Sequence, residues 1–202
     1  MILMAAKKPL PRIGVDMYTY FPITEGDSGD NYGTAVSLPG TVEIAPTDEG
    51  GSAVFEADNV VYTSASYIAN MGHEITNADI PPETDATWRG LEPVNGVLTV
   101  TNEAKSPKFG VAWRVKKADG TYRYVRYYKG VYSFASAVGG QTQSTTGEPE
   151  YTTAQATFTA EANAAGQYYS YVDETDLNAT DAADIKTEWF SGMEWVPAGE
   201  QA

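Results

Sequence analysis

Cysteine is absent from the 202-residue sequence, and histidine occurs only once, as His73. Without cysteine the chain has no disulfide framework, no thiolate metal site and no thiol nucleophile. No serine stands beside the histidine to complete a nucleophile–base pair, so we interpret His73 as structural or solvated. We therefore expect that the protein is not an enzyme and that it has no catalytic residue.

Long apolar runs are missing as well. No window approaches the roughly 18 apolar residues that a membrane-spanning helix requires. The apolar start, Met1–Met4, is followed by Lys7 and Lys8, whereas a secretory signal places its charges first and has a longer apolar core. We expect no signal peptide and no membrane contact, in a protein that is made in a cytoplasm.

Basic residues are scarce: 13 Lys and Arg stand against 27 Asp and Glu, which gives a formal net charge of -14. Few cations are available to neutralise phosphates, so tight wrapping onto nucleic acid is not expected. The basic residues are also unevenly placed, because eight of them lie between Lys105 and Lys129, where Asp119 is the only acid. The sequence therefore predicts a basic element set into an acidic, self-repelling body.

Segments in which apolar and polar residues alternate dominate the sequence. Alternation with a period of two and many β-branched or aromatic residues are typical of β-strands. Strands are expected at residues 13–23, 36–44, 53–62, 67–75, 97–101, 109–132 (a hairpin), 152–160 and 168–172. Pro39-Gly40 predicts a bulge or break in the second of these. Residues 133–150 are small and polar without periodicity, which predicts a long mobile loop.

Two short helices interrupt the strands. Asp79-Ile80-Pro81-Pro82-Glu83 has a capping residue followed by prolines in the first turn, so a helix is expected to begin there and to end near Gly90. Thr180-Asp181 predicts the cap of a second helix, which Ile185 and Trp189 would dock. The sequence therefore predicts a mainly β protein, an antiparallel β-sandwich or barrel with one short central helix and one short C-terminal helix.

The basic window is predicted to form a hairpin. Asp119-Gly120 is a signal for a two-residue type I′ turn, which would place Lys116 opposite Arg123 and Trp113 opposite Arg126. Like charges directly opposed destabilise a sheet, so this face is interpreted as awaiting an acidic partner, with a merely solvated face as the alternative. The candidate contacts between subunits are Arg114, Lys116, Lys117, Arg123, Arg126 and Lys129.

Two acidic segments and the tyrosines are the candidates for metal and sugar sites. The segment Glu25–Asp30 has the composition of a calcium loop but not its ligand spacing, and the acids of Asp173–Asp176 are interpreted as a solvated turn. We expect no metal site, no cofactor and no cofactor-binding residue. The 14 tyrosines keep open an alternative in which the protein is a β-sandwich glycan-binding or virion-surface decoration module, because flat rings stack on sugars.

Taken together, the order of elements resembles the major tail protein family of long-tailed bacteriophages. The resemblance covers roughly residues 13–190 and includes the Trp189-Phe190 ending. Three stretches carry it: Asp79-Ile80-Pro81-Pro82-Glu83, then Lys108–Val115 with Asp119–Val125, and Tyr127-Tyr128-Lys129-Gly130-Val131-Tyr132-Ser133.

The resemblance implies a function in the virion. It implies a tail tube protein that self-assembles into homohexameric rings, which stack into the conduit for genome ejection into the host. DNA would pass through an acidic lumen without specific binding. The implied partners are other copies of the chain and further tail proteins, namely the terminator, the tape measure and the distal tail protein. The implied location is the phage tail, with assembly in the host cytoplasm.

Three regions are expected on this basis. Residues 1–12 form an N-terminal arm, residues 13–190 form a single tail-tube β domain that includes the loop 133–150, and residues 191–202 form a C-terminal tail. The arm and the loop are expected to order on a neighbouring subunit and to lock the stack.

Overall fold

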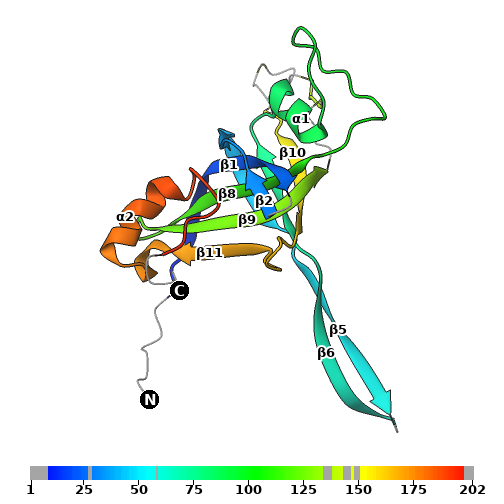
Figure 1. Ribbon diagram of the computed structural model, residues 1–202, viewed down its shortest axis with the longest axis vertical. Coiled ribbons are helices and arrows are strands. Elements are labelled where there is room, and N and C mark those ends of the chain that lie inside the picture. The colour runs from blue at the N-terminus through cyan, green and yellow to red at the C-terminus, as the bar shows by residue number, and fades with distance from the viewer. Residues whose placement is uncertain are drawn as a thin grey trace.

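Strands make up most of the part of the chain that the computed structural model describes (Figure 1). The described residues are 9–26, 29–57, 59–133, 138–142, 147 and 151–197. The strands are β1 (Arg12–Gly26), β2 (Gly29–Tyr32), β3 (Val36–Ser37), β4 (Thr41–Pro46), β5 (Glu49–Ala57), β6 (Val60–Asn70), β7 (Gly72–Asn77), β8 (Lys108–Lys117), β9 (Tyr122–Ser133), β10 (Ala154–Glu161) and β11 (Tyr169–Asp173). The helices are α1 (Pro82–Arg89), the 3-10 helix η1 (Glu174–Asp176) and α2 (Ala179–Glu188). The predicted mainly β fold with two short helices is confirmed.

One antiparallel sheet has the strand order β2-β1-β8-β9-β10-β7-β4, with β3 attached to β1 and β11 attached to β9. Strand β9 pairs along one edge with β8, and its other edge is divided between two neighbours. Residues 123–127 pair with β11, whereas residues 129–133 pair with β10. The sheet therefore splits at the middle of β9, and it folds into an open sandwich and not into a closed barrel.

The main core lies inside this fold and is rich in aromatic rings. Trp113 of β8 stacks on Tyr127 of β9, with the ring centroids 5.5 Å apart. Helix α1 covers one end, where Trp88 stacks on Tyr132 at 3.9 Å between centroids. His73 is fully buried within this core, which makes it structural and not solvated.

Helix α2 covers the opposite face of β8 and β9. Ile185 and Trp189 pack there with Tyr124 of β9 and Phe21 of β1. Trp189 also donates its indole N–H to the Val125 carbonyl oxygen at 3.2 Å. The predicted docking of this helix through Ile185 and Trp189 is confirmed.

The cap of α2 was predicted at the wrong residue. Asn178 is the N-cap, and its Oδ1 accepts hydrogen bonds from the backbone N–H groups of Thr180 and Asp181, both at 3.0 Å. Thr180 and Asp181 are the donors and so lie inside the first turn, where the acid is favoured by the helix dipole. In α1, Asp79 likewise does not cap the helix: Pro81 occupies the cap position, and the helix ends as predicted at Gly90.

The cap assignment gives a stability prediction. Asn178→Ala removes the acceptor of two backbone N–H groups and is expected to lower the free energy of unfolding by about 1 kcal/mol. Thr180→Ala leaves that acceptor in place and is expected to change it by less than about 0.5 kcal/mol. Urea unfolding of both variants measures the difference, and equal effects of the two substitutions would contradict the assignment.

Three strand predictions need correction. Residues 53–62 are not one strand, because a turn that includes Asn59 at a φ of 64° separates β5 from β6. Residues 67–75 are likewise divided between β6 and β7. Residues 97–101 are not a strand: Asn95 and Gly96 form a tight turn at positive φ, and only one bridge, between Val94 and Val97, forms there. The predicted break at Pro39-Gly40 is confirmed.

The register of the basic hairpin also differs from the prediction. The backbone N–H of Lys117 donates to the Thr121 carbonyl and so closes a loop of three residues, 118–120, in which Gly120 adopts a φ of 87°. Lys116 therefore lies opposite Tyr122, and Arg123 lies opposite Val115. Trp113 is paired with Val125 and not with Arg126. A shift of one residue moves side chains to the other face, so the predicted pair of facing cations does not exist.

The expected terminal and loop regions are only partly described. The expected arm is described from residue 9, and its last residue, Arg12, already belongs to β1. Of the expected loop, residues 133, 138–142 and 147 are described, and the expected tail is described to residue 197. The ordering of these segments on a neighbour lies outside the described residues.

Candidate functional site

Asp173, at the end of β11, is the partner of two predicted contact residues. Arg123 donates to its carboxylate from Nε at 2.6 Å and from a terminal nitrogen at 3.0 Å. Lys117 forms a second ion pair with the same carboxylate. The Arg123 hydrogen bond, followed by the one from Lys117, lowers the pKa of Asp173 from 3.8 to about 2. Glu174 accepts a hydrogen bond from the Tyr122 backbone N–H at 3.2 Å and pairs with Lys186 at 2.8 Å. The interpretation of Asp173–Asp176 as a solvated turn is therefore wrong at its first two residues.

Two further predicted contacts have partners within the chain. Arg114 donates to both carboxylate oxygens of Asp16, at 2.6 and 3.1 Å. Lys129 Nζ lies 2.6 Å from a carboxylate oxygen of Glu25 and 2.9 Å from one of Asp30, and these two acids raise the lysine pKa. Glu25 and Asp30 of the calcium-like segment thus pair with a lysine from the middle of the sheet.

Arg126 and Lys116, the last two of the six candidate contact residues, differ in their surroundings. Arg126 is buried beneath α2, where its guanidinium lies 4.3 Å from the centroid of a Trp189 ring and its Nε donates to Ser170 Oγ at 3.0 Å. Lys116 is exposed, and its side chain has no hydrogen bond or ion pair within the described part of the chain. A role in subunit contacts stays a prediction for all six residues, but only Lys116 could form such a contact without losing an internal partner.

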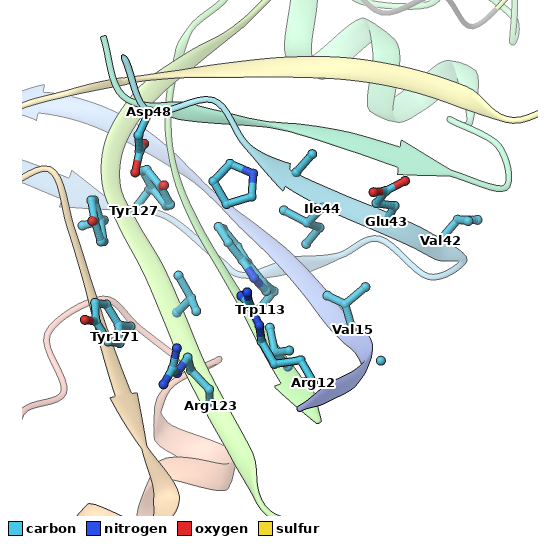
Figure 2. Close-up of a pocket in the computed structure, with 16 residues that line it drawn as sticks. Arg12, Val15, Val42, Glu43, Ile44, Asp48, Trp113, Arg123, Tyr127 and Tyr171 are labelled. Carbon is cyan, nitrogen blue, oxygen red and sulfur yellow. The ribbon is translucent and has the colours of Figure 1, made fainter. Parts of the chain in front are cut away.

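An apolar groove of about 730 Å³ opens where the sheet splits (Figure 2). Alternate residues of β8 and β9 form its floor, because side chains of one strand face point the same way. The floor residues are Trp113, Val115, Val125 and Tyr127. Strand β4 forms one wall with residues 42–46, and β11 contributes Tyr169 and Tyr171. Helix α2 covers the other face of the same strands. In the floor of the groove, Trp113 and Tyr127 are buried, whereas Val115 and Val125 are partly exposed.

The rim of the groove carries four charged residues. Arg123 is held by Asp173, and its guanidinium also lies 5.1 Å from the centroid of the Tyr171 ring. Asp48 accepts a hydrogen bond from the Gly72 backbone N–H at 3.3 Å. Burial, and after it the charge of Asp48, raises the pKa of the Tyr127 hydroxyl. Arg12 and Glu43 are exposed and form no ion pair within the described part of the chain.

The hairpin of β5 and β6 is the second unusual feature. It projects far from the body, and its strands pair only with each other (Figure 1). Described side chains of β6 are all exposed. The exposed apolar side chains of the two hairpin strands include Val54, Phe55, Val60, Val61, Tyr62, Tyr67 and Ile68. Phe55 and Tyr62 touch edge to face, with centroids 6.2 Å apart, yet remain 61% and 75% exposed.

Sequence reasoning missed both surfaces. The alternation of the hairpin residues matches that of a half-buried strand, so the sequence predicts two strands of the sheet there and not a projecting hairpin. The available signal was the turn residue Asn59 inside the first range. The groove had no signal, since its walls come from segments that lie far apart in the sequence.

The described residues contain no group of three or more His, Asp or Glu side chains placed to hold a metal ion. They also contain no helix that is long and apolar enough to cross a membrane. Neither a protein-family model nor a curated protein matches the sequence.

Proposed function

We propose that this protein is a structural subunit that works by self-assembly, specifically a tail tube protein of a long-tailed bacteriophage, and that it has no enzymatic activity. Its homohexameric rings stack into a tube, and the genome passes through the lumen into the host. The terminator, the tape measure and the distal tail protein are its further partners. The protein resides in the virion tail after assembly in the host cytoplasm.

The observation that carries the proposal is the projecting hairpin. A two-stranded hairpin is marginally stable in water on its own, and this one exposes Val, Phe, Tyr and Ile side chains without any cover from the body. Each of its strands also has one unpaired edge, a feature that invites pairing with another chain. A contiguous apolar surface of this kind marks an interaction site.

The charge of the chain fits the role of a conduit. A net charge of -14 repels DNA phosphates, so a duplex slides without sticking. Five of the eight basic residues in the window 105–129 are held by internal carboxylates of β1, β2, β10 and β11: Lys108, Arg114, Lys117, Arg123 and Lys129. Few cations therefore remain to hold DNA.

The proposal predicts assembly without nucleic acid or cofactor. Mass photometry and electron microscopy of the purified protein at rising concentration are expected to show ring-sized species or polymers. The expected reason is burial of the apolar hairpin surface, which grows with subunit concentration. A protein that stays monomeric at all concentrations and salt levels, and that purified tail partners cannot convert, would contradict the proposal.

A glycan-binding module is the second candidate function. The observation that favours it is the stack of Tyr169 on Tyr171 at the groove, with centroids 6.3 Å apart and Tyr171 58% exposed. Most other tyrosines of this sheet cover its two faces, as Tyr124 and Tyr127 do. Uniform small particles that bind oligosaccharides would favour this function over a tube subunit.

A further inference from the structure

The hairpin and the groove are two surfaces of one chain that expose apolar side chains, at Phe55 and Tyr62 in the hairpin and at Val42 and Tyr171 in the groove. The hairpin begins at Glu49, directly after the groove residue Asp48. It extends away from the body (Figure 1), so its tip is far from the groove of its own chain.

We propose that the groove receives the tip of the β5–β6 hairpin of a second copy of this chain. This inference rests on the proposed function and assigns the surface on the neighbour to which the hairpin binds. The contact joins two different surfaces, so it is heterologous, and repeated contacts of this kind produce closed rings or open helical chains.

The side chains of the two surfaces match in character. The tip offers Phe55 and Tyr62 as exposed aromatic anchors. The groove offers the exposed side chains of Val42 and Tyr171 beside a floor of partly exposed Val115 and Val125. Aromatic residues that fill an apolar pocket contribute most of the energy of protein interfaces. The groove volume of about 730 Å³ is in the range that accommodates several such side chains.

The backbone of the groove wall also has free hydrogen-bonding groups. Strand β4 pairs only with β7 among the described strands. Consecutive residues 42–46 of β4 line the groove, so the strand presents its edge to the groove and not one of its faces. A hairpin strand with an unpaired edge can add to such a strand edge, and main-chain hydrogen bonds then support the side-chain contacts.

The charges favour one orientation of the hairpin in the groove. The described part of the hairpin has no Lys or Arg, and it carries Glu49 and Glu56. Glu49 accepts a hydrogen bond from Asn70 at 3.1 Å, which leaves Glu56 near the tip without an ion pair within the described residues. Arg12 on the rim of the groove is also unpaired there. We therefore pair Glu56 of one copy with Arg12 of the next, on the side of the groove away from Glu43.

Disulfide trapping tests the contact, because the chain has no cysteine of its own. Thr63→Cys places a thiol on the hairpin, and Val42→Cys places one on the groove wall, both at exposed positions. Mild oxidation of a mixture of the two variants is expected to give a mixed disulfide, identified by mass spectrometry. Ala165→Cys, at an exposed site elsewhere, replaces Val42→Cys in the control mixture and is expected to give at least tenfold less product.

A charge exchange tests the orientation. Arg12→Glu is expected to lower the yield of the mixed disulfide about fivefold, and Glu56→Arg on the hairpin partner is expected to restore it. If Arg12→Glu has no effect, the pairing of these two residues is wrong.

The outcomes separate this inference from the proposed function. Rings or tubes with the mixed disulfide support both. Rings or tubes with no more product than the control overturn the groove as the binding site and leave the tube function in place. Absence of both assembly and cross-link overturns both, and it favours the glycan-binding function if oligosaccharides occupy the groove.

Discussion

Replacement of residues 53–65 by an Asn-Gly turn is expected to abolish assembly and to leave the subunit folded. Ser52 and Ser66 are register partners in the hairpin, so a two-residue turn joins them without a change of register. The removed segment contributes no residue to either core cluster of the described chain. The loss should therefore fall on contacts between subunits alone.

Two measurements check this expectation. Thermal unfolding followed by circular dichroism should give a midpoint close to that of the parent chain, and mass photometry should show only monomers. Phe55→Ser with Tyr62→Ser is the milder version and should weaken assembly strongly, because the aromatic anchors are removed. Val97→Ser removes an equally exposed apolar side chain outside the hairpin and serves as the matched control. Normal polymers of the truncated chain would show that the hairpin has no role in assembly.

The basic hairpin shows which structural features the sequence pattern predicts and which it does not. Alternation located β8 and β9 correctly, and Asp119-Gly120 located the turn. The pattern did not decide whether the loop has two residues or three, because glycine at positive φ suits both turn types. The third loop residue shifts the strand register by one position and so decides which side chains face each other. The expected opposition of Lys116 and Arg123 was therefore wrong.

The partners of the basic residues were beyond sequence reasoning for another reason. Asp173 is 50 residues from Arg123, and Asp16 is 98 residues from Arg114. Strand pairing of β9 with β11 and of β1 with β8 brings these residues together, and nothing local specifies those pairings. The charge segregation of the sequence is real, but the fold has largely neutralised it within one subunit.

The helices were predictable to different degrees. Short-range rules placed both helices and the end of α1 at Gly90, because caps and prolines act within one turn. They failed at the exact caps, since Asn178, Thr180 and Asp181 all suit the first turn of a helix. A difference of two residues is within the range in which several polar side chains compete for the same N–H groups.

The buried histidine is the residue with the clearest consequence for pH. His73 is fully buried, and its Nε2 lies 2.8 Å from the Tyr18 hydroxyl. Its Nδ1 has no hydrogen-bond partner among the residues that the structure describes, and its ring stacks on Phe158 with centroids 5.0 Å apart. Nothing in this apolar surrounding stabilises a positive ring, so burial lowers the pKa of His73 from 6.5 to about 3.

The subunit is therefore expected to lose stability as the pH falls below 6.5. The unfolded chain binds a proton at His73 through that range while the folded chain does not, so the free energy of unfolding falls by about 1.4 kcal/mol per pH unit below the unfolded pKa, or about 2 kcal/mol between pH 7.5 and pH 5. Urea unfolding at a series of pH values measures this slope on the hairpin-truncated chain, in which assembly does not interfere.

His73 is the only histidine, and cysteine is absent, so no other side chain of the sequence ordinarily titrates near pH 6. His73→Gln keeps a polar side chain beside Tyr18 and cannot gain this charge, so it is expected to be less stable at pH 7.5 but flat down to pH 5. A variant that keeps the slope of the parent chain would show that His73 is not its source.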